Sequence, residues 1–169
     1  MASLLDPDRR HDMGEADPVV REALERATVG PGRREVSGTD HLDAVVALCM
    51  ARLFMPVVEH EGELSAVKLT HPTGDTALLA FTGADSLAEW NARARPVPGH
   101  LDDMAATVVE SGADVLLVDV AGPSPFVVGP ELVAELAQGH RLVKLADGYG
   151  WLAEAGPHAG DPDEARDRD

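Results

Sequence analysis

The feature of this sequence that most constrains its fold is a pair of strand-like runs on either side of a turn. Residues 64–70 and 76–81 have strand character, and the segment HPTGD at 71–75 separates them. Proline presets the backbone for a turn, and glycine supplies conformations that other residues avoid. The sequence therefore predicts a β-hairpin over residues 64–81, which is its strongest local signal.

Apolar spacing predicts two helices before this hairpin. Apolar residues repeat at intervals of three and four over residues 42–53, which predicts a helix capped by Thr39 or Asp40. Asp17 can cap a helix and Pro18 suits the first helical position, so a shorter helix is predicted near residues 18–28. Its weak apolar stripe could dock on the main domain.

Three further helices are predicted after the hairpin. Thr82 can cap a short helix that carries Leu87 and Trp90 inward, while Ser86 and Glu89 form a competing capping box. Residues 95–99 have the composition of a proline-rich joint, and the helix that follows them ends at a glycine, Gly112. The last helix is predicted to begin at residues 129–131.

Short apolar runs predict the remaining strands. Residues 54–58 have strand character, and Pro56 favours an edge position or the start of a strand. Residues 115–118 are typical of a buried strand, and residues 125–128 and 141–145 predict shorter ones. Because the elements follow no regular βαβ alternation, the predicted fold class is α+β. We expect a single domain with a mixed or antiparallel sheet, a β-hairpin and helices packed on it.

Composition divides the chain into three parts. Residues 1–36 are charged and poor in large apolar side chains, so they are predicted to be an N-terminal tail with the helix near 18–28. Residues 37–155 form the predicted folded domain. Residues 156–169 combine proline, glycine and acidic residues, and we expect a disordered acidic tail there.

The charge balance excludes several kinds of partner. The chain has 14 Lys and Arg against 30 Asp and Glu, a formal net charge of -16, which argues against binding nucleic acid or anionic lipid. Its longest apolar run, residues 44–51, falls far short of the ~20 residues that span a bilayer, and no signal-peptide core is present. With Cys49 as the single cysteine, no internal disulfide can form. These features predict a cytoplasmic protein without membrane contact.

No group of residues predicts catalysis, a cofactor or a metal. His60 among Glu59, Glu61 and Glu63 could ligate a divalent cation, but a solvated acidic turn explains the same residues. Cys49 lies on the apolar stripe of its helix, where a thiolate is disfavoured. We therefore predict no catalytic residue, no cofactor and no metal site.

Two residues support a pocket as an alternative. Asp119 follows a buried strand, and ionisable groups at strand ends line many sites; alternatively, its side chain bonds the backbone of the turn at Gly122. Trp90 could cap a small apolar pocket, or anchor the core together with Leu87. Both interpretations of each residue remain open from the sequence.

Several segments, taken in order, resemble the N-terminal domain of the SseB family, as found in single-domain acidic bacterial members. They are RLFMPVV (52–58), TALLAFT (76–82), the 87–90 helix, ARPVP (94–98), GADVLLVD (112–119) before Ala121-Gly122-Pro123, and AQG (137–139). The resemblance extends over residues 17–139. It implies the fold of that domain and brings no catalytic residue to this chain.

The resulting hypothesis is a non-enzymatic protein-interaction or regulatory domain that binds a protein partner, with a basic partner favoured by the acidic charge. We expect the contact surface at Gly122, Pro123, Ser124 and Pro125, because a loop stiffened by proline loses little entropy on binding. The alternative is a small-molecule sensor or enzyme with a pocket near Trp90 and Asp119. A third possibility is a homo-oligomer that uses the edge of the 64–81 hairpin.

Overall fold

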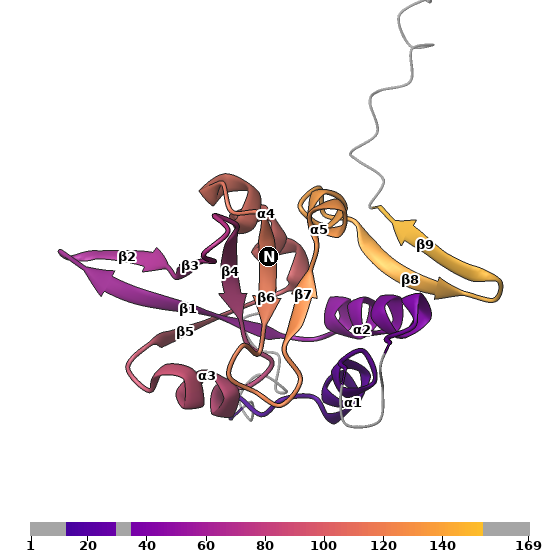
Figure 1. Ribbon diagram of the computed structural model, residues 1–169, viewed down its shortest axis with the longest axis horizontal. Helices are drawn as coiled ribbons and strands as arrows, with labels where there is room; N and C mark the ends of the chain where they lie inside the picture. The colour runs from indigo at the N-terminus through magenta and orange to yellow at the C-terminus, as the bar shows by residue number, and fades with distance from the viewer. Residues whose placement is uncertain (1–12, 30–34, 154–169) are drawn as a thin grey trace, which may run out of the picture.

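The computed structural model describes residues 13–29 and 35–153 (Figure 1). The helices are α1 (Pro18–Arg26), α2 (Gly38–Met50), α3 (Ala84–Asn91), α4 (Leu101–Ser111) and α5 (Pro130–Leu136). The strands are β1 (Leu53–His60), β2 (Glu63–Ala66), β3 (Lys68–Thr70), β4 (Thr76–Ala80), β5 (Arg95–Gly99), β6 (Val115–Val118), β7 (Phe126–Val128), β8 (Arg141–Leu145) and β9 (Gly148–Leu152). The α+β class is confirmed. The acidic tail predicted at 156–169 lies outside the described residues, as does the beginning of the N-terminal tail.

The first two helices pack against each other and contribute to the main core. The Asp17 carboxylate caps α1 by accepting from the backbone N–H of Val19 (2.8 Å), with Pro18 as the first helical residue. α2 is capped by Ser37, whose hydroxyl accepts from the N–H of Asp40 (3.0 Å). The predicted caps Thr39 and Asp40 are therefore wrong, because both lie inside the first turn. The apolar stripe of α1 is buried in the same cluster as α2 and the sheet.

A three-stranded antiparallel sheet has the order β2-β1-β5. β1 is its central strand, so the edge position predicted from Pro56 is wrong. Its pairing with β2 begins only at Val57, which leaves Pro56 beside β5 alone, opposite Pro96. The joint predicted at 95–99 is the edge strand β5. An edge strand tolerates prolines at alternate positions, because only every second N–H faces the neighbouring strand.

A four-stranded mixed sheet has the order β3-β4-β6-β7, with β4 and β6 parallel and the other pairs antiparallel. The predicted hairpin exists where β3 pairs with β4. Its first arm is not one strand, because residues 63–66 pair with β1 and the chain changes sheets at Val67. The parallel pair is connected through α3, β5 and α4.

The third sheet is a hairpin of β8 and β9 at one end of the molecule beside α2 (Figure 1). The sequence predicted β8, whereas β9 was missed. Tyr149 holds the hairpin to α2 by donating its hydroxyl to the Asp43 carboxylate, which also accepts from Lys144 (2.9 Å).

Two apolar clusters form the core. The larger joins α1, α2, α4 and α5 to the sheets, and Leu48, Leu53, Leu116 and Leu136 are fully buried in it. The smaller surrounds Phe81 beneath α3. Within the described part of the chain, no helix combines the length and the apolar character needed to cross a membrane.

Candidate functional site

Asp119 is the centre of a buried hydrogen-bonded cluster directly after β6. The residue is 6% exposed. Its Oδ1 accepts from the backbone N–H of Thr82 (2.9 Å), and its Oδ2 accepts from Thr82 Oγ1 (2.6 Å). Ser86 Oγ lies 2.9 Å from Asp119 Oδ1 and 3.0 Å from the carbonyl oxygen of Gly83, so its one proton serves two acceptors. These donors replace water around the buried carboxylate.

The parallel pairing of β4 and β6 explains this cluster. Parallel strands bring their carboxyl ends to one edge of a sheet, which is where open sheets commonly bind ligands. The N–H of Asp119 continues the pairing by donating to the Ala80 carbonyl (2.9 Å), and this places Thr82 beside the carboxylate. The prediction that Thr82 caps α3 is therefore wrong. The cap position belongs to Gly83, and Ser86 lies within the helix.

Asp119 also starts the loop that follows β6. Its φ of 50° lies in the left-handed region, where Asp is tolerated better than most residues. The N–H of Gly122 donates to the backbone carbonyl of Asp119 (2.9 Å). The interpretation that the Asp119 side chain bonds the Gly122 turn is thus wrong, because the backbone closes that turn and the carboxylate holds Thr82 and Ser86.

Arg21 connects α1 to this cluster. Its two terminal nitrogens donate to the two oxygens of Asp85 on α3, at 2.6 and 2.7 Å, and its Nε lies 3.4 Å from Thr82 Oγ1. The bond from Arg21 lowers the pKa of Asp85, and the same bond raises the pKa of Arg21. The pair is fixed in its charged form, and it forms one wall of a cavity.

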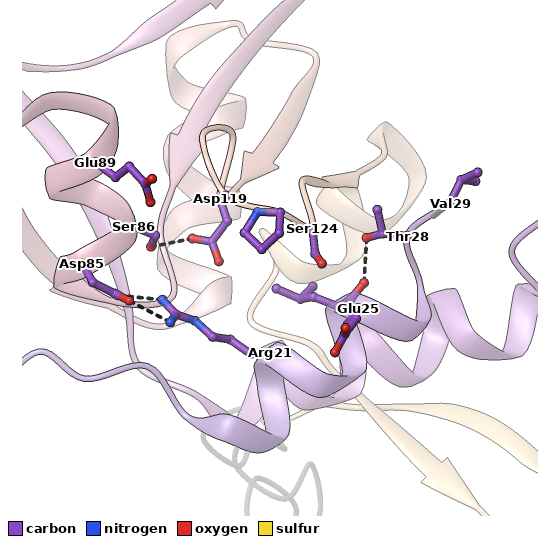
Figure 2. A pocket seen from close by; sticks show the side chains of 12 residues that line it. Arg21, Glu25, Thr28, Val29, Asp85, Ser86, Glu89, Asp119 and Ser124 are labelled. Atoms are coloured by element: carbon purple, nitrogen blue, oxygen red, sulfur yellow. Dashed lines mark hydrogen bonds and ion pairs between the residues drawn. The ribbon is translucent and has the colours of Figure 1, made fainter. Parts of the chain in front are cut away.

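The cavity has a volume of about 470 Å³ and lies between α1, α3 and the loop after β6. We call it the α1–α3 cavity. Figure 2 shows Asp85, Ser86 and Glu89 of α3 on one side, Glu25, Thr28 and Val29 on the other, and Asp119 and Ser124 between them. Its lining residues are Arg21, Leu24, Glu25, Thr28, Val29, Asp85, Ser86, Glu89, Asp119, Gly122, Pro123 and Ser124. Four are carboxylates and one is a guanidinium, so the wall is acidic.

Some of the residues singled out in the sequence line this cavity, and others do not. The lining includes Asp119, which was expected in a pocket, and three residues that were expected to contact a partner: Gly122, Pro123 and Ser124. Pro125 is outside the lining. Trp90 is outside it too, since its ring packs on Phe81 with centroids 5.6 Å apart. The structure thus joins the expected contact loop to Asp119 and places Trp90 at the smaller core cluster.

The sequence reasoning missed the residues that the helices contribute. Arg21 and Glu25 of α1, and Thr28 just beyond its end, follow helical spacing beside the buried stripe, and this spacing predicts that they share one polar face. On α3, Ser86 and Glu89 were interpreted as a capping box. No local pattern shows that these two faces meet.

The remaining candidates lie away from the cavity. His60 and Glu63 flank a two-residue turn at Glu61 and Gly62, and Glu59 lies 3.7 Å from Arg95. No group of three or more potential metal ligands occurs over residues 13–29 and 35–153. Cys49 is buried, and burial raises the pKa of its thiol.

Comparison with known proteins gives one match. The family model described as the SseB protein N-terminal domain matches residues 20–135, which include α3, the loop after β6 and all of α1 except its first two residues. Neither the curated proteins nor the solved structures gave a match to the chain.

Proposed function

We propose that this chain, which belongs to the SseB family, is a non-enzymatic protein-interaction or regulatory domain. In this proposal the α1–α3 cavity receives a lysine or arginine side chain from a basic segment of a partner protein. The observation that carries it is the charge of the lining, where Glu25, Asp85, Glu89 and Asp119 face a single cation that is already paired.

Two carboxylates of the lining, Glu25 and Glu89, have no ion-pair partner among residues 13–29 and 35–153, and they are the attractive part of the wall. Asp85 is neutralised by Arg21, and Asp119 is enclosed by its donors. Glu25 and Glu89 are exposed on opposite sides of the cavity (Figure 2), so both carboxylates add to the negative potential that a cation would meet there. Anionic ligands would meet repulsion from the same pair.

The apolar part of the lining fits the same ligand. Leu24, Val29 and Pro123 contribute carbon surface to the cavity. Lysine and arginine carry an aliphatic stem below the charged group, so a partner's side chain could cover the carbon surface while its head reaches the glutamates. A rigid loop at Pro123 favours this binding because little conformational freedom is lost.

The hydroxyl groups in the site support a binding role over a catalytic one. A nucleophilic hydroxyl needs both a base within hydrogen-bonding reach and access to a substrate. Thr82 and Ser86 donate to the Asp119 carboxylate, but all three residues are buried, with exposed fractions of 2%, 6% and 6%, which fits a structural hydrogen-bond network better than an exposed nucleophile. We propose a cytoplasmic location for this binding, because the one cysteine is a buried free thiol.

The test is an NMR titration of the full chain with a short capped peptide rich in lysine and arginine, beside an acidic peptide of equal length. We expect amide shifts at Thr28, Ser86 and Ser124 with the basic peptide only, and weaker binding as salt is added. Equal shifts with the acidic peptide, or none with the basic one, contradict the proposal.

Isosteric variants locate the site. Glu25→Gln and Glu89→Gln each remove one charge and are expected to weaken binding about two- to five-fold, as for exposed charge pairs. Glu110→Gln is the matched control, because Glu110 is an exposed glutamate of α4 outside the cavity lining. Equal losses in all three variants indicate a general charge effect, which also contradicts the proposal.

One observation favours a second candidate, a small-molecule sensor. The cavity volume of about 470 Å³ lies within the range of small-molecule sites, about 300–1,000 Å³. Melting temperatures with amino acids, nucleotides and divalent metals test this candidate, since a ligand of the native state raises them. A raised Tm without any peptide binding favours the sensor.

A further inference from the structure

The outer edge of β9 differs from the other strand edges of this domain. The edge strand β5 contains two prolines and an arginine, and β2 begins with a glutamate. β3 and β7 have only three residues each, and β3 includes a lysine. Charge, proline and short length all hinder pairing with another chain.

β9 has none of these protections. Gly148–Leu152 has five residues without charge or proline, and within the described ranges it pairs only with β8. Every second backbone N–H and C=O of β9 faces away from β8. Trp151 and Leu152 are 37% and 57% exposed beside this edge. Such an edge is suited to accept one further strand.

The sequence of β9 indicates which strand that is. Its order of glycine, aromatic, glycine, aromatic and leucine is nearly symmetric about Gly150. We propose that two copies of this chain pair through β9 in an antiparallel arrangement, with the twofold axis at Gly150. Tyr149 then lies opposite Trp151 of the second copy, twice, because a twofold interface repeats each contact.

The spacing of side chains supports this register. Residues directly opposite in an antiparallel pair lie on the same face, and Tyr149 and Trp151 share a face because they are two positions apart. On the other face, Leu152 meets the glycine at position 148, so no large side chains collide. The strand itself has no charge, so pairing brings no like charges into contact.

The size and charge of the interface predict its behaviour. An interface of five residues on each side buries less surface than the ~1,200 Å² of stable complexes. We therefore expect the dimer only at high protein concentration. Two chains of net charge -16 repel each other, and added salt screens this repulsion. Added salt should therefore strengthen the dimer, whereas it should weaken the binding of a basic peptide. The salt dependence thus allows one proposal to be contradicted without the other.

Sedimentation equilibrium of the full chain over a wide concentration range tests the proposal. We expect the mass to rise toward twice the monomer value, more so in high salt. Leu152→Lys should abolish the rise by placing a charge on the edge. Leu64→Lys is the matched control, because Leu64 is 58% exposed on the edge strand β2. A monomer at every concentration overturns the proposal, and so does an equal response of the two variants.

Cross-linking tests the register and does not depend on the folding of the lysine variant. Gly150→Cys places two thiols across the twofold axis, and its Cβ meets only the mobile end of Leu145 (3.1 Å). Oxidation should yield a disulfide-linked dimer, whereas the natural chain with buried Cys49 should not form one. A dimer in solution that Gly150→Cys does not cross-link overturns the Gly150 axis.

Discussion

The guanidinium of Arg21 on α1 makes two parallel hydrogen bonds to the carboxylate of Asp85 on α3, although 64 positions separate the two residues. This pair links the two helices that line the α1–α3 cavity. The same arginine approaches Thr82, which in turn donates to Asp119. The cavity thus depends on contacts between three distant segments.

Removing both members of the pair should show a small coupling between them. Both side chains are partly exposed, at 41% and 64%, so solvent screens their attraction. In a double-mutant cycle with Arg21→Ala and Asp85→Ala, we expect a coupling of about 0.5–1 kcal/mol from urea unfolding. Arg21→Lys should retain only part of it, because lysine cannot bind both oxygens in parallel. A coupling near zero contradicts the two-bond geometry.

Asp119→Ala should destabilise the protein by about 3 kcal/mol, since it leaves buried donors of Thr82 and Ser86 without an acceptor. Asp119→Asn retains one carbonyl oxygen and tolerates the left-handed backbone, so we expect a loss of only about 1 kcal/mol. Urea unfolding measures both values. Equal losses in the two variants would show that the acceptors are not the cause.

Gly83→Ala should destabilise by about 1–3 kcal/mol through overpacking. Its Cβ would lie 2.5 Å from Asp85 Oδ1 and 3.0 Å from the backbone of Ala16. Gly129→Ala is the matched control, because Gly129 is also the cap residue of a helix and its Cβ would meet nothing within 4 Å. Thermal unfolding of the two variants should therefore differ, with Gly83→Ala melting lower.

The protein should lose stability in acid through Asp114. This carboxylate accepts from the backbone N–H and hydroxyl of Thr76, and these bonds hold its pKa below the ordinary value. The unfolded chain therefore binds the proton more readily, and stability falls as the pH drops below about 4 toward the folded-state pKa. Urea midpoints measured down this range should fall less steeply in Asp114→Asn than in the natural chain.

His41 should add a loss that begins nearer neutral pH. Its ring stacks on Phe126 with centroids 4.6 Å apart, and burial lowers its pKa. Stability should decline as the pH falls below about 6.5, where the unfolded chain becomes protonated first, and level off below the folded-state pKa. Replacing the histidine, as in His41→Gln, should remove this early decline from the midpoints and leave the later one.

Local patterns predicted those elements whose signals are contained in a few consecutive residues. Asp17 with Pro18 begins α1, and Gly112 ends α4 in the left-handed conformation. The strand at 54–58 and the prolines of 95–99 were interpreted separately. The strand at 54–58 exists as part of β1, but its edge position and the joint at 95–99 were wrong. Both errors have one cause: the prolines are tolerated because of how β1 and β5 pair, and the sequence does not show that pairing.

The site was predictable in the same limited way. Asp119 and the loop after it could be selected, because a charged residue at the end of an apolar strand is a local signal. Its partner Thr82 could not, since their contact depends on parallel pairing of β4 and β6 across a long crossover. Arg21 and Asp85 depend on how α1 docks, which has no short-range signature.

The long separation of these segments has a consequence during protein synthesis. Arg21 leaves the ribosome well before Asp119, and translation adds about 5–20 residues per second, so roughly 5–20 s pass before both halves of the cavity exist. Throughout that time α1 carries an apolar stripe that the completed core will bury. Until the core is complete, this stripe is exposed apolar surface, which makes the nascent chain prone to aggregate.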